Sequence, residues 1–125
     1  MTGFIIEFYE DTNEDKPVEK FLLSLDVKMQ AKLLGMLQIL QEKGNQLREP
    51  YSKYLEDGIF ELRTKNGTDI TRVLYFFYYG RKIILTNGFV KKTQKTQKTP
   101  RKEILLAKRR KADYIERSKT HEIFK

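Results

Sequence analysis

The sequence predicts an α+β domain: an antiparallel-rich, four-stranded sheet with an N-terminal αα-hairpin on one face, followed by a C-terminal helix. Three observations lead to this prediction. β-Prone runs alternate with turn signals between residues 59 and 92, apolar residues at helical spacing precede them, and a Thr-Pro pair that can open a helix follows them. A chain of 125 residues fits one domain, here 1–125.

A three-stranded meander is predicted at the centre of the chain. Ile59–Lys65 is followed by Asn66-Gly67, a strong signal for a type I′ hairpin turn. The next run, Ile70–Tyr79, is rich in branched and aromatic residues. It breaks at Gly80-Arg81, which suits a II′ turn before Lys82–Phe89.

The first turn determines which residues oppose one another. With the Asn-Gly pair at its centre, Arg63 lies opposite Ile70 and Glu61 lies opposite Arg72. The two arginines then share one face of the sheet as diagonal neighbours.

The second turn adds to the same face. With the Gly-Arg pair at its centre, Phe89 lies opposite Arg72, and Lys91 follows on the same side. One more residue in a loop would turn a strand over and scatter this set. The other face is apolar and carries Phe60, Leu62, Val73, Tyr75 and Phe77.

The N-terminal part supplies a strand and two helices. Gly3–Tyr9 is β-prone and is expected to add the fourth strand. Pro17 suits the first turn of a helix that runs to about Leu25. Asp26 is expected to cap a second helix, which ends at Gly44. The two helices form the αα-hairpin that covers the apolar face of the sheet.

Two further segments complete the chain. Residues 45–56 are expected to be a connection, and Lys91–Thr99 has no apolar residue and must be exposed. Thr99 as N-cap and Pro100 at the first helical position open the last helix. We expect the tail after Arg117 to fray, with His121 in it idle rather than catalytic.

Composition excludes several classes of protein. There is no cysteine, which removes disulfides and thiolate chemistry, and the single histidine cannot form a polyhistidine metal site. No P-loop, dinucleotide-binding turn or Ser-His-Asp arrangement is visible, so we expect no metal and no cofactor. No apolar run is long enough to span a membrane and no secretory signal begins the chain, which predicts a cytoplasmic protein.

Charge is concentrated at the C-terminal end. Residues 91–125 hold 13 Lys and Arg against 4 Asp and Glu, a net charge of +9, whereas residues 1–90 hold 12 against 13. This asymmetry favours a polyanionic partner, either nucleic acid or an acidic protein segment. The alternative is a solvated basic helix without a ligand.

The basic cluster suits RNA chemistry that needs no metal. Arg63 and Arg72 could clamp a phosphate and stabilise its developing charge while the 2′-hydroxyl attacks, and Lys91 or Lys92 could assist proton transfer. Glu61 is a candidate base; its alternative role is a cross-strand ion pair with Arg72. The alternative for the arginines is a salt-bridged sheet face.

Aromatic and basic residues around this cluster are candidates for RNA binding. Tyr54 and Phe89 could stack on bases, and Lys95 and Lys98 could contact phosphates. Tyr54 could instead serve in packing.

Three segments carry a resemblance to a known family. Gly58–Arg63, then Arg72, then Gly88–Thr96 resemble the phage-derived HigB-type toxins of the RelE/ParE superfamily, and the similarity spans nearly the whole chain. It implies a RelE-like fold and the toxin of a type II toxin–antitoxin system. Such a toxin is a ribosome-dependent, metal-independent endoribonuclease that cleaves mRNA and inhibits translation. Arg63, Arg72, Lys91 and Lys92 match the family's basic positions, but the catalytic histidines of some relatives have no counterpart.

The resemblance also implies partners. These are a HigA-type helix-turn-helix antitoxin, mRNA on the ribosome with contacts to rRNA, and operator DNA through the antitoxin; no membrane is involved. Two alternatives from other classes stay open: a ParE-like gyrase poison and a non-catalytic basic module that binds the ribosome or nucleic acid.

Overall fold

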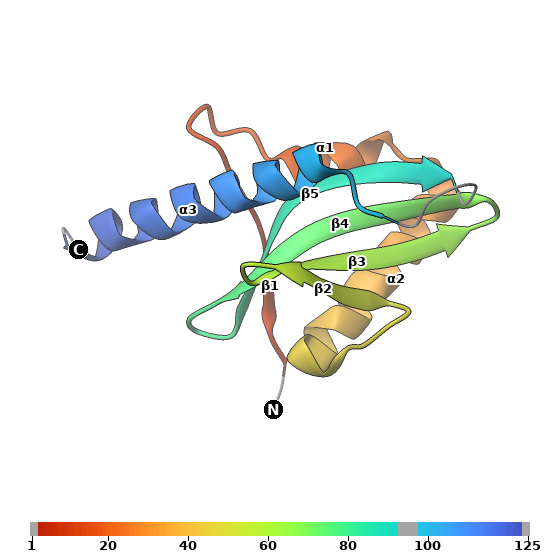
Figure 1. Cartoon of the computed structure of the whole chain (residues 1–125), viewed down its shortest axis with the longest axis horizontal. Coiled ribbons are helices and arrows are strands. Elements are labelled where there is room, and N and C mark those ends of the chain that lie inside the picture. Colours follow the sequence, from red (N-terminus) through yellow and green to blue (C-terminus); the bar gives the residue numbers. More distant parts are fainter. Residues whose placement is uncertain (1–2, 93–97, 124–125) are drawn as a thin grey trace.

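The computed structural model describes residues 3–92 and 98–123 (Figure 1). Their secondary structure confirms the α+β class. In chain order the elements are β1 (Ile5–Phe8), α1 (Pro17–Ser24), α2 (Val27–Lys43), a 3₁₀ turn (Gly44–Gln46), β2 (Ser52–Glu56), β3 (Ile59–Asn66), β4 (Asp69–Tyr78), β5 (Lys82–Lys92) and α3 (Arg101–Ile123).

The sheet has one more strand than predicted. Within the described residues it is a five-stranded mixed sheet in the order β1-β5-β4-β3-β2, with β1 parallel to β5 and the other pairs antiparallel. The extra strand, β2, falls in the segment expected to be a connection, because its short polar sequence carries little strand signal. Tertiary contacts hold it: Ser52 pairs with Leu62, and its hydroxyl is hydrogen-bonded to that of Tyr75, whose pKa burial raises to about 12.

Helices cover both faces of the sheet. In Figure 1, α1 and α2 lie behind the sheet and α3 crosses in front of it. α1 packs against β5 and α2 against β3, so the two helices share one face but spread across it, and the predicted αα-hairpin is matched in part. The core on this side contains the residues predicted for the apolar face and their helical partners: Val18, Leu22, Leu33, Leu37, Leu40, Leu62, Val73, Tyr75, Ile83 and Leu85, with Phe60 and Phe77 packed against them.

A second apolar cluster lies beneath α3. It unites Tyr9, Ile59, Leu74, Phe76, Ile84 and Ala107. The face that was expected to carry the polar side chains is therefore apolar along the part that α3 covers. Arg63 and Arg72 lie at the end of that face nearer the start of α3, where Glu61, on the same face, contacts Thr99.

The predicted starts of α1 and α2 agree with the structure, whereas that of α3 does not. Pro17 is the first residue of α1, and the Asp26 side chain accepts a hydrogen bond from a backbone N–H in the first turn of α2. The predicted start of α3 is off by one residue: the helix starts at Arg101 instead of Pro100, and the Thr99 hydroxyl donates to Glu61 instead of capping the helix. α3 also continues to Ile123, beyond the residue 117 where fraying was expected. No helix in the described ranges is long and apolar enough to cross a membrane.

The β3–β4 turn is shifted by one residue from the prediction. Asn66 pairs with Asp69, so Gly67 and the following threonine occupy the centre. Gly67 has a φ of +66°, which fits the first central position of a II′ turn rather than the second position of the expected I′ turn. Moving a turn by one residue moves the register by two, so each side chain keeps its face. Arg63 consequently lies directly opposite Arg72 instead of diagonally.

The β4–β5 hairpin differs from the prediction in two ways, and the two differences cancel each other. Tyr78 pairs with Lys82, so the loop has three residues and not the expected two. The register then shifts at a bulge, because Leu74 pairs with Asn87 whereas its neighbour Tyr75 pairs with Leu85. Beyond the bulge the predicted pairing holds, with Phe89 opposite Arg72 and Lys91 opposite Ile70.

Candidate functional site

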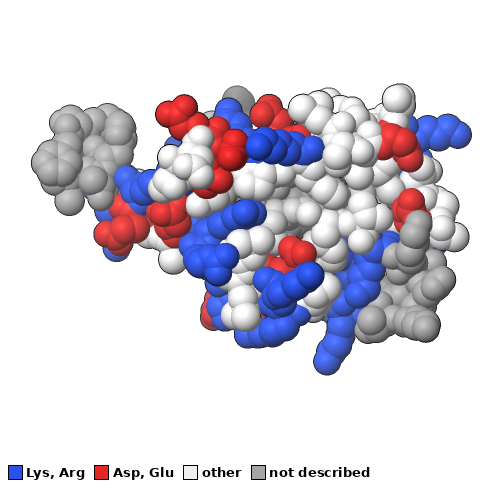
Figure 2. All heavy atoms as spheres, turned by 90° about the horizontal axis from the view of Figure 1, so that it is seen from above, with Lys and Arg blue, Asp and Glu red and all other residues white. Residues whose placement is uncertain are grey.

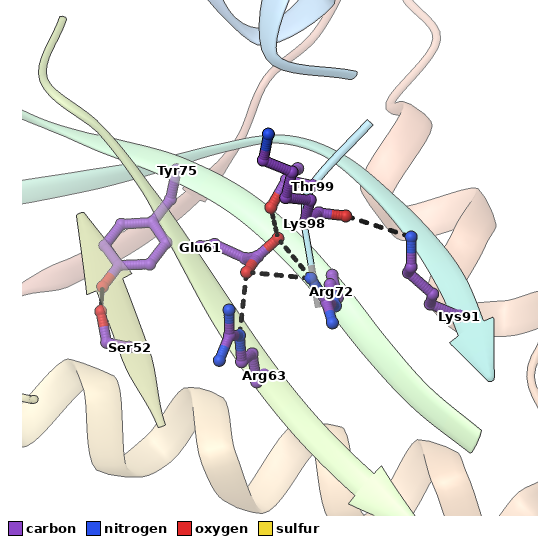
Figure 3. A network of polar contacts seen from close by, with 8 residues as sticks. All are labelled: Ser52, Glu61, Arg63, Arg72, Tyr75, Lys91, Lys98 and Thr99. Carbon is purple, nitrogen blue, oxygen red and sulfur yellow. Dashed lines mark hydrogen bonds and ion pairs between the residues drawn. The ribbon is translucent and has the colours of Figure 1, made fainter. Parts of the chain in front are cut away.

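A buried carboxylate is the centre of the candidate site. Glu61 in β3 is 0% exposed and lies on the side of the sheet that faces α3. Its Oε1 accepts a hydrogen bond from Arg63 Nε at 2.9 Å, and its Oε2 lies 3.4 Å from Arg72 Nη1. Thr99 Oγ1 donates to the same Oε2 at 2.5 Å (Figure 3). These contacts compensate the cost of burying a charge, which is large for an unpaired carboxylate.

Strand register brings the cluster together. Arg63 and Arg72 are opposed across β3 and β4, and Glu61 is two residues before Arg63 on the same face. Two guanidinium groups side by side would repel each other, so the carboxylate between them offsets their charge. Glu61 thus forms the ion pair with Arg72 that was its alternative prediction, and both of its oxygens accept hydrogen bonds.

The two arginines differ in accessibility. Arg72 is 1% exposed, while the Arg63 side chain retains 17%. A ligand arriving from solvent therefore meets Arg63 first. The buried Arg72 guanidinium adds positive charge from beneath and fixes the position of Glu61.

A groove opens beside this cluster, with a volume of about 590 Å³. Lys53 and Leu55 of β2, Lys91 of β5, the connection 98–100, and Arg101 and Ile104 of α3 line it, as does Tyr54. Among the described lining residues there are four cations and no carboxylate. We call it the cationic groove. Figure 2, which shows the molecule of Figure 1 from above, has Lys and Arg side chains crowded over much of the lower half of the view.

The connection before α3 is tied to both walls of the cationic groove. Lys91 Nζ donates a hydrogen bond to the backbone carbonyl of Lys98 at 3.1 Å, and the next residue, Thr99, donates to Glu61. Lys98 thereby lies at the mouth of the groove, one residue from the buried cluster. The structure thus brings Arg63, Arg72, Lys91, Lys98 and Glu61 into one region (Figure 3).

The remaining predicted site residues take no part in the described contacts around Glu61. The Tyr54 ring packs edge-on against Phe60 at 5.1 Å between centroids, and its hydroxyl accepts a hydrogen bond from the backbone N–H of Gly58, although the residue is 55% exposed. Phe89 is half-buried opposite Arg72. Lys92 is the last residue of β5, and its side chain, like the whole of Lys95, lies outside the described part of the structure.

An ionic contact holds the start of α3 against the β2–β3 turn. Arg101 binds Glu56 through both terminal nitrogens, at 2.6 and 2.8 Å, and Lys108 lies 2.7 Å from both Glu56 and Asp57. Hydrogen bonds from Arg101 and then Lys108 lower the pKa of Glu56 to about 2, against the desolvation that would raise it. Lys111 Nζ donates to the Asp57 carbonyl. We call this set the α3 clasp.

Sequence reasoning missed three contributors to the site. Thr99 was assigned as a helix cap, Lys53 was placed in a connection, and the acidic turn at Glu56 received no role. Ser52–Glu56 does not alternate between polar and apolar residues, so no pattern indicated the strand that places Lys53. Nothing local indicated the contact between Thr99 and Glu61, because the two residues are 38 positions apart.

The fold and the site together define a class: a small α+β protein with a mixed sheet, whose basic C-terminal helix and strand ends form a cation-lined groove over a buried carboxylate–diarginine cluster. Comparison of the sequence with known families gives a narrower assignment. Residues 20–112, well over half of the chain, match the model of the family described as Phage derived protein Gp49-like (DUF891). The chain therefore belongs to this family, which lies in the RelE/HigB-like toxin–antitoxin context. No curated protein matches the chain.

The α3 clasp predicts a specific loss of stability in acid. The folded-state pKa of Glu56 lies below its ordinary value of 4.5, so the clasp stabilises the folded protein above about pH 4.5 and is lost as the pH falls toward 2. We expect the thermal midpoint, followed by circular dichroism, to drop through this window. Glu56→Gln should lower the midpoint at pH 7 and flatten its decline below pH 4.5. An identical pH profile for Glu56→Gln and the wild type would contradict this role.

The Thr99 hydroxyl is predicted to stabilise the buried cluster. Thr99→Val keeps the shape of the side chain but removes one donor from Glu61, and should cost about 1 kcal/mol of unfolding free energy, because a buried acceptor loses a charge-assisted hydrogen bond. Thr99→Ser retains the donor and serves as the matched control. Denaturant titration measures both variants, and equal midpoints for Thr99→Val and Thr99→Ser would refute the prediction.

Proposed function

We propose that this protein is the toxin of a type II toxin–antitoxin system and that it acts as a ribosome-dependent, metal-independent endoribonuclease on mRNA. One observation carries the proposal: Glu61, which holds Arg63, also binds Thr99 in the lining of a groove that carries Lys53, Lys91, Lys98 and Arg101. Such an arrangement suits a phosphodiester strand, since arginine binds phosphate with parallel donors and lysines supply point charges. The toxin–antitoxin context of the family supports it.

The proposed chemistry uses the RNA's own nucleophile. The 2′-oxygen forms a bond to phosphorus while the bond to the 5′-oxygen breaks, which leaves a 2′,3′-cyclic phosphate and a 5′-hydroxyl. Arg63 contacts the phosphate and stabilises its developing charge, and Arg72 adds its field from the buried side. Such a route asks the protein for alignment, charge stabilisation and proton transfer, and needs no metal ion.

Proton transfer is assigned to lysine rather than to the carboxylate. Both oxygens of Glu61 accept hydrogen bonds from the arginines and Thr99, so its role is to orient those donors. Lys91, which lines the groove, protonates the departing 5′-oxygen, with Lys92 as the second candidate. The 2′-hydroxyl releases its proton to water.

Binding of the message relies on the remaining candidates. Lys98 and Lys95 contact backbone phosphates before and after the scissile one, and Phe89 and Tyr54 offer ring surface to bases. The ribosome completes the site by presenting the mRNA in the correct conformation while basic residues of α3 contact rRNA. The partner in the resting cell is a HigA-type helix-turn-helix antitoxin, which recruits the pair to operator DNA. The place of action is the cytoplasm.

A second candidate function follows from the burial of Arg72. Because this guanidinium is 1% exposed and paired with Glu61, the cluster could serve as a rigid support for a basic surface that binds the ribosome or nucleic acid without cutting RNA. Phosphate contacts supply affinity for DNA and RNA alike, so charge does not separate this candidate, or a ParE-like gyrase poison, from the ribonuclease.

The experiment that tests the ribonuclease is induced expression in cells with mapping of transcript 5′ ends. The wild type should generate new ends within translated messages. Arg63→Ala should reduce them at least about a hundredfold, a loss typical of removing a group that stabilises transition-state charge. Lys91→Ala should also reduce them. The matched control is Lys28→Ala, which removes an exposed lysine of α2 on the opposite side of the sheet.

Three outcomes separate the candidates. Growth arrest with intact messages and broken DNA selects the gyrase poison, and arrest with both intact selects the non-catalytic module. Unchanged cutting by Arg63→Ala would refute the site. Purified ribosomes with a defined mRNA, assayed with and without EDTA, test the dependence on the ribosome and on metal separately.

A further inference from the structure

A second hollow lies on the side of the sheet that α2 covers. α2 runs behind β3 in Figure 1, and the hollow between them has a volume of about 680 Å³. Its walls are largely apolar and include Met36, Ile39, Pro50 and Tyr51. Two of these side chains are open to solvent, since Ile39 is 40% and Tyr51 is 50% exposed. We call this hollow the α2 groove. Its volume lies within the range of sites that hold small organic ligands.

The β3 wall of the α2 groove contains a buried hydroxyl without a partner. Thr64 lines the groove and is 4% exposed. Strand alternation places its side chain on the same face as Phe60 and Leu62, which belong to the core beneath α2. Among the residues that the structure describes, none forms a hydrogen bond with its Oγ1. A buried polar group without a partner is costly and uncommon in folded proteins.

This hydroxyl suits a polar group that enters the α2 groove. A threonine side chain has three staggered rotamers, so rotation about the Cα–Cβ bond turns its hydroxyl toward a ligand without a change in the backbone. The hydroxyl both donates and accepts, and a ligand that satisfies it removes the cost of leaving it unpaired. Thr64 is therefore the polar contact that would orient a ligand among apolar walls.

Gly35 leaves the opposite wall of the α2 groove open. It lies in the middle of α2, where glycine is less favourable than any residue except proline. Apart from the helix's own backbone and the adjacent residues, no described heavy atom lies within 4 Å of the position that a β-carbon would take. Packing within the described chain therefore does not require glycine here. The missing side chain leaves space for a group from outside.

One lysine supplies the charge of the α2 groove. Lys32 precedes Gly35 by three residues, so it lies on the same side of the helix, and it is exposed. Arg63 and Lys65 also border the groove, but alternation along β3 sends their side chains to the other face, where Arg63 binds Glu61. No carboxylate is found among the described lining residues. The groove therefore favours an anion over a cation.

We propose that the α2 groove binds a small monocarboxylic acid with an apolar body, either an alkyl or an aryl acid. The body fills the space beside Gly35, against Met36 and Ile39. The carboxylate accepts a hydrogen bond from the Thr64 hydroxyl, and Lys32 adds charge attraction. One hydroxyl and one lysine match a single carboxylate, whereas a phosphate chain would find too few donors among the apolar walls. The proposal does not rest on the ribonuclease function.

The binding test is an NMR titration of the full-length chain with two probes, decanoate and 4-phenylbutyrate. At least one should bind saturably, and the tighter of the two identifies the body as alkyl or aryl. Decylamine has the same apolar chain as decanoate but the opposite charge, and should bind at least about tenfold more weakly. Gly35→Phe fills the groove and should weaken binding about tenfold or more, whereas Gly35→Ala, the matched control, should stay within about twofold.

The hydroxyl is tested with Thr64→Val, which keeps the shape of the side chain. Because the hydroxyl has no partner in the described chain, this variant should keep or raise the thermal midpoint of the free protein. It should nevertheless bind the acids about tenfold more weakly. The control is Thr71→Val, which removes a neighbouring hydroxyl that already donates to the Thr64 carbonyl and is not among the lining residues. This control should bind the acids within about twofold of the wild type.

Each outcome decides. No saturable binding of either acid, equal binding of decylamine, or undiminished binding by Gly35→Phe or Thr64→Val would overturn the proposal. A lowered thermal midpoint of Thr64→Val would overturn it as well, since the hydroxyl would then already have a partner. Binding is measured without RNA. Its failure therefore leaves the ribonuclease proposal intact, and a protein that binds the acid but never cuts RNA would refute only the ribonuclease proposal.

Discussion

The contact between Glu61 and the two arginines is the constraint on which the site depends. Burying a carboxylate with no exposed surface is costly without donors, and two opposed guanidinium groups repel each other without an anion between them. Each of these charged side chains therefore lowers the energetic cost of placing the others in the cluster. The same carboxylate receives the Thr99 hydroxyl, so the chain leading into α3 is fixed by the cluster that lies beneath it.

The placement of α3 shows how the basic excess of the C-terminal segment is divided. Arg101, Lys108 and Lys111 engage the acidic β2–β3 turn, where they hold the helix over the second apolar cluster. Because these cations form contacts within the protein, the positive charge available to a ligand is smaller than the net charge of residues 91–125 suggests. Lys53, from the part of the chain with balanced charge, contributes to the cationic groove instead.

The sequence predicted the fold class, both N-terminal helices and the shared face of Arg63 and Arg72, because these depend on local spacing and on side-chain alternation. It did not predict β2, which is held by pairing with β3 and by the contact between Ser52 and Tyr75. Nor did it predict the apolar floor beneath α3, since alternation in a strand does not reveal which helix covers which face. The contact between Thr99 and Glu61 was not predicted either. A threonine before a proline is typical of a helix N-cap, and no local pattern indicates a distant contact.

The three-residue β4–β5 loop and the bulge at Leu74 and Tyr75 form a length-compensating pair. Each by itself would reverse the orientation of every side chain at the far end of β5, and together they leave Phe89 and Lys91 facing the arginines. Side-chain orientation at the end of β5 is thus kept only if the loop and the bulge are both present or both absent. In an alignment of relatives, a one-residue gap in this hairpin would be neutral when matched by a second gap in the strand, and an unmatched gap would mark a protein whose basic face has been rebuilt.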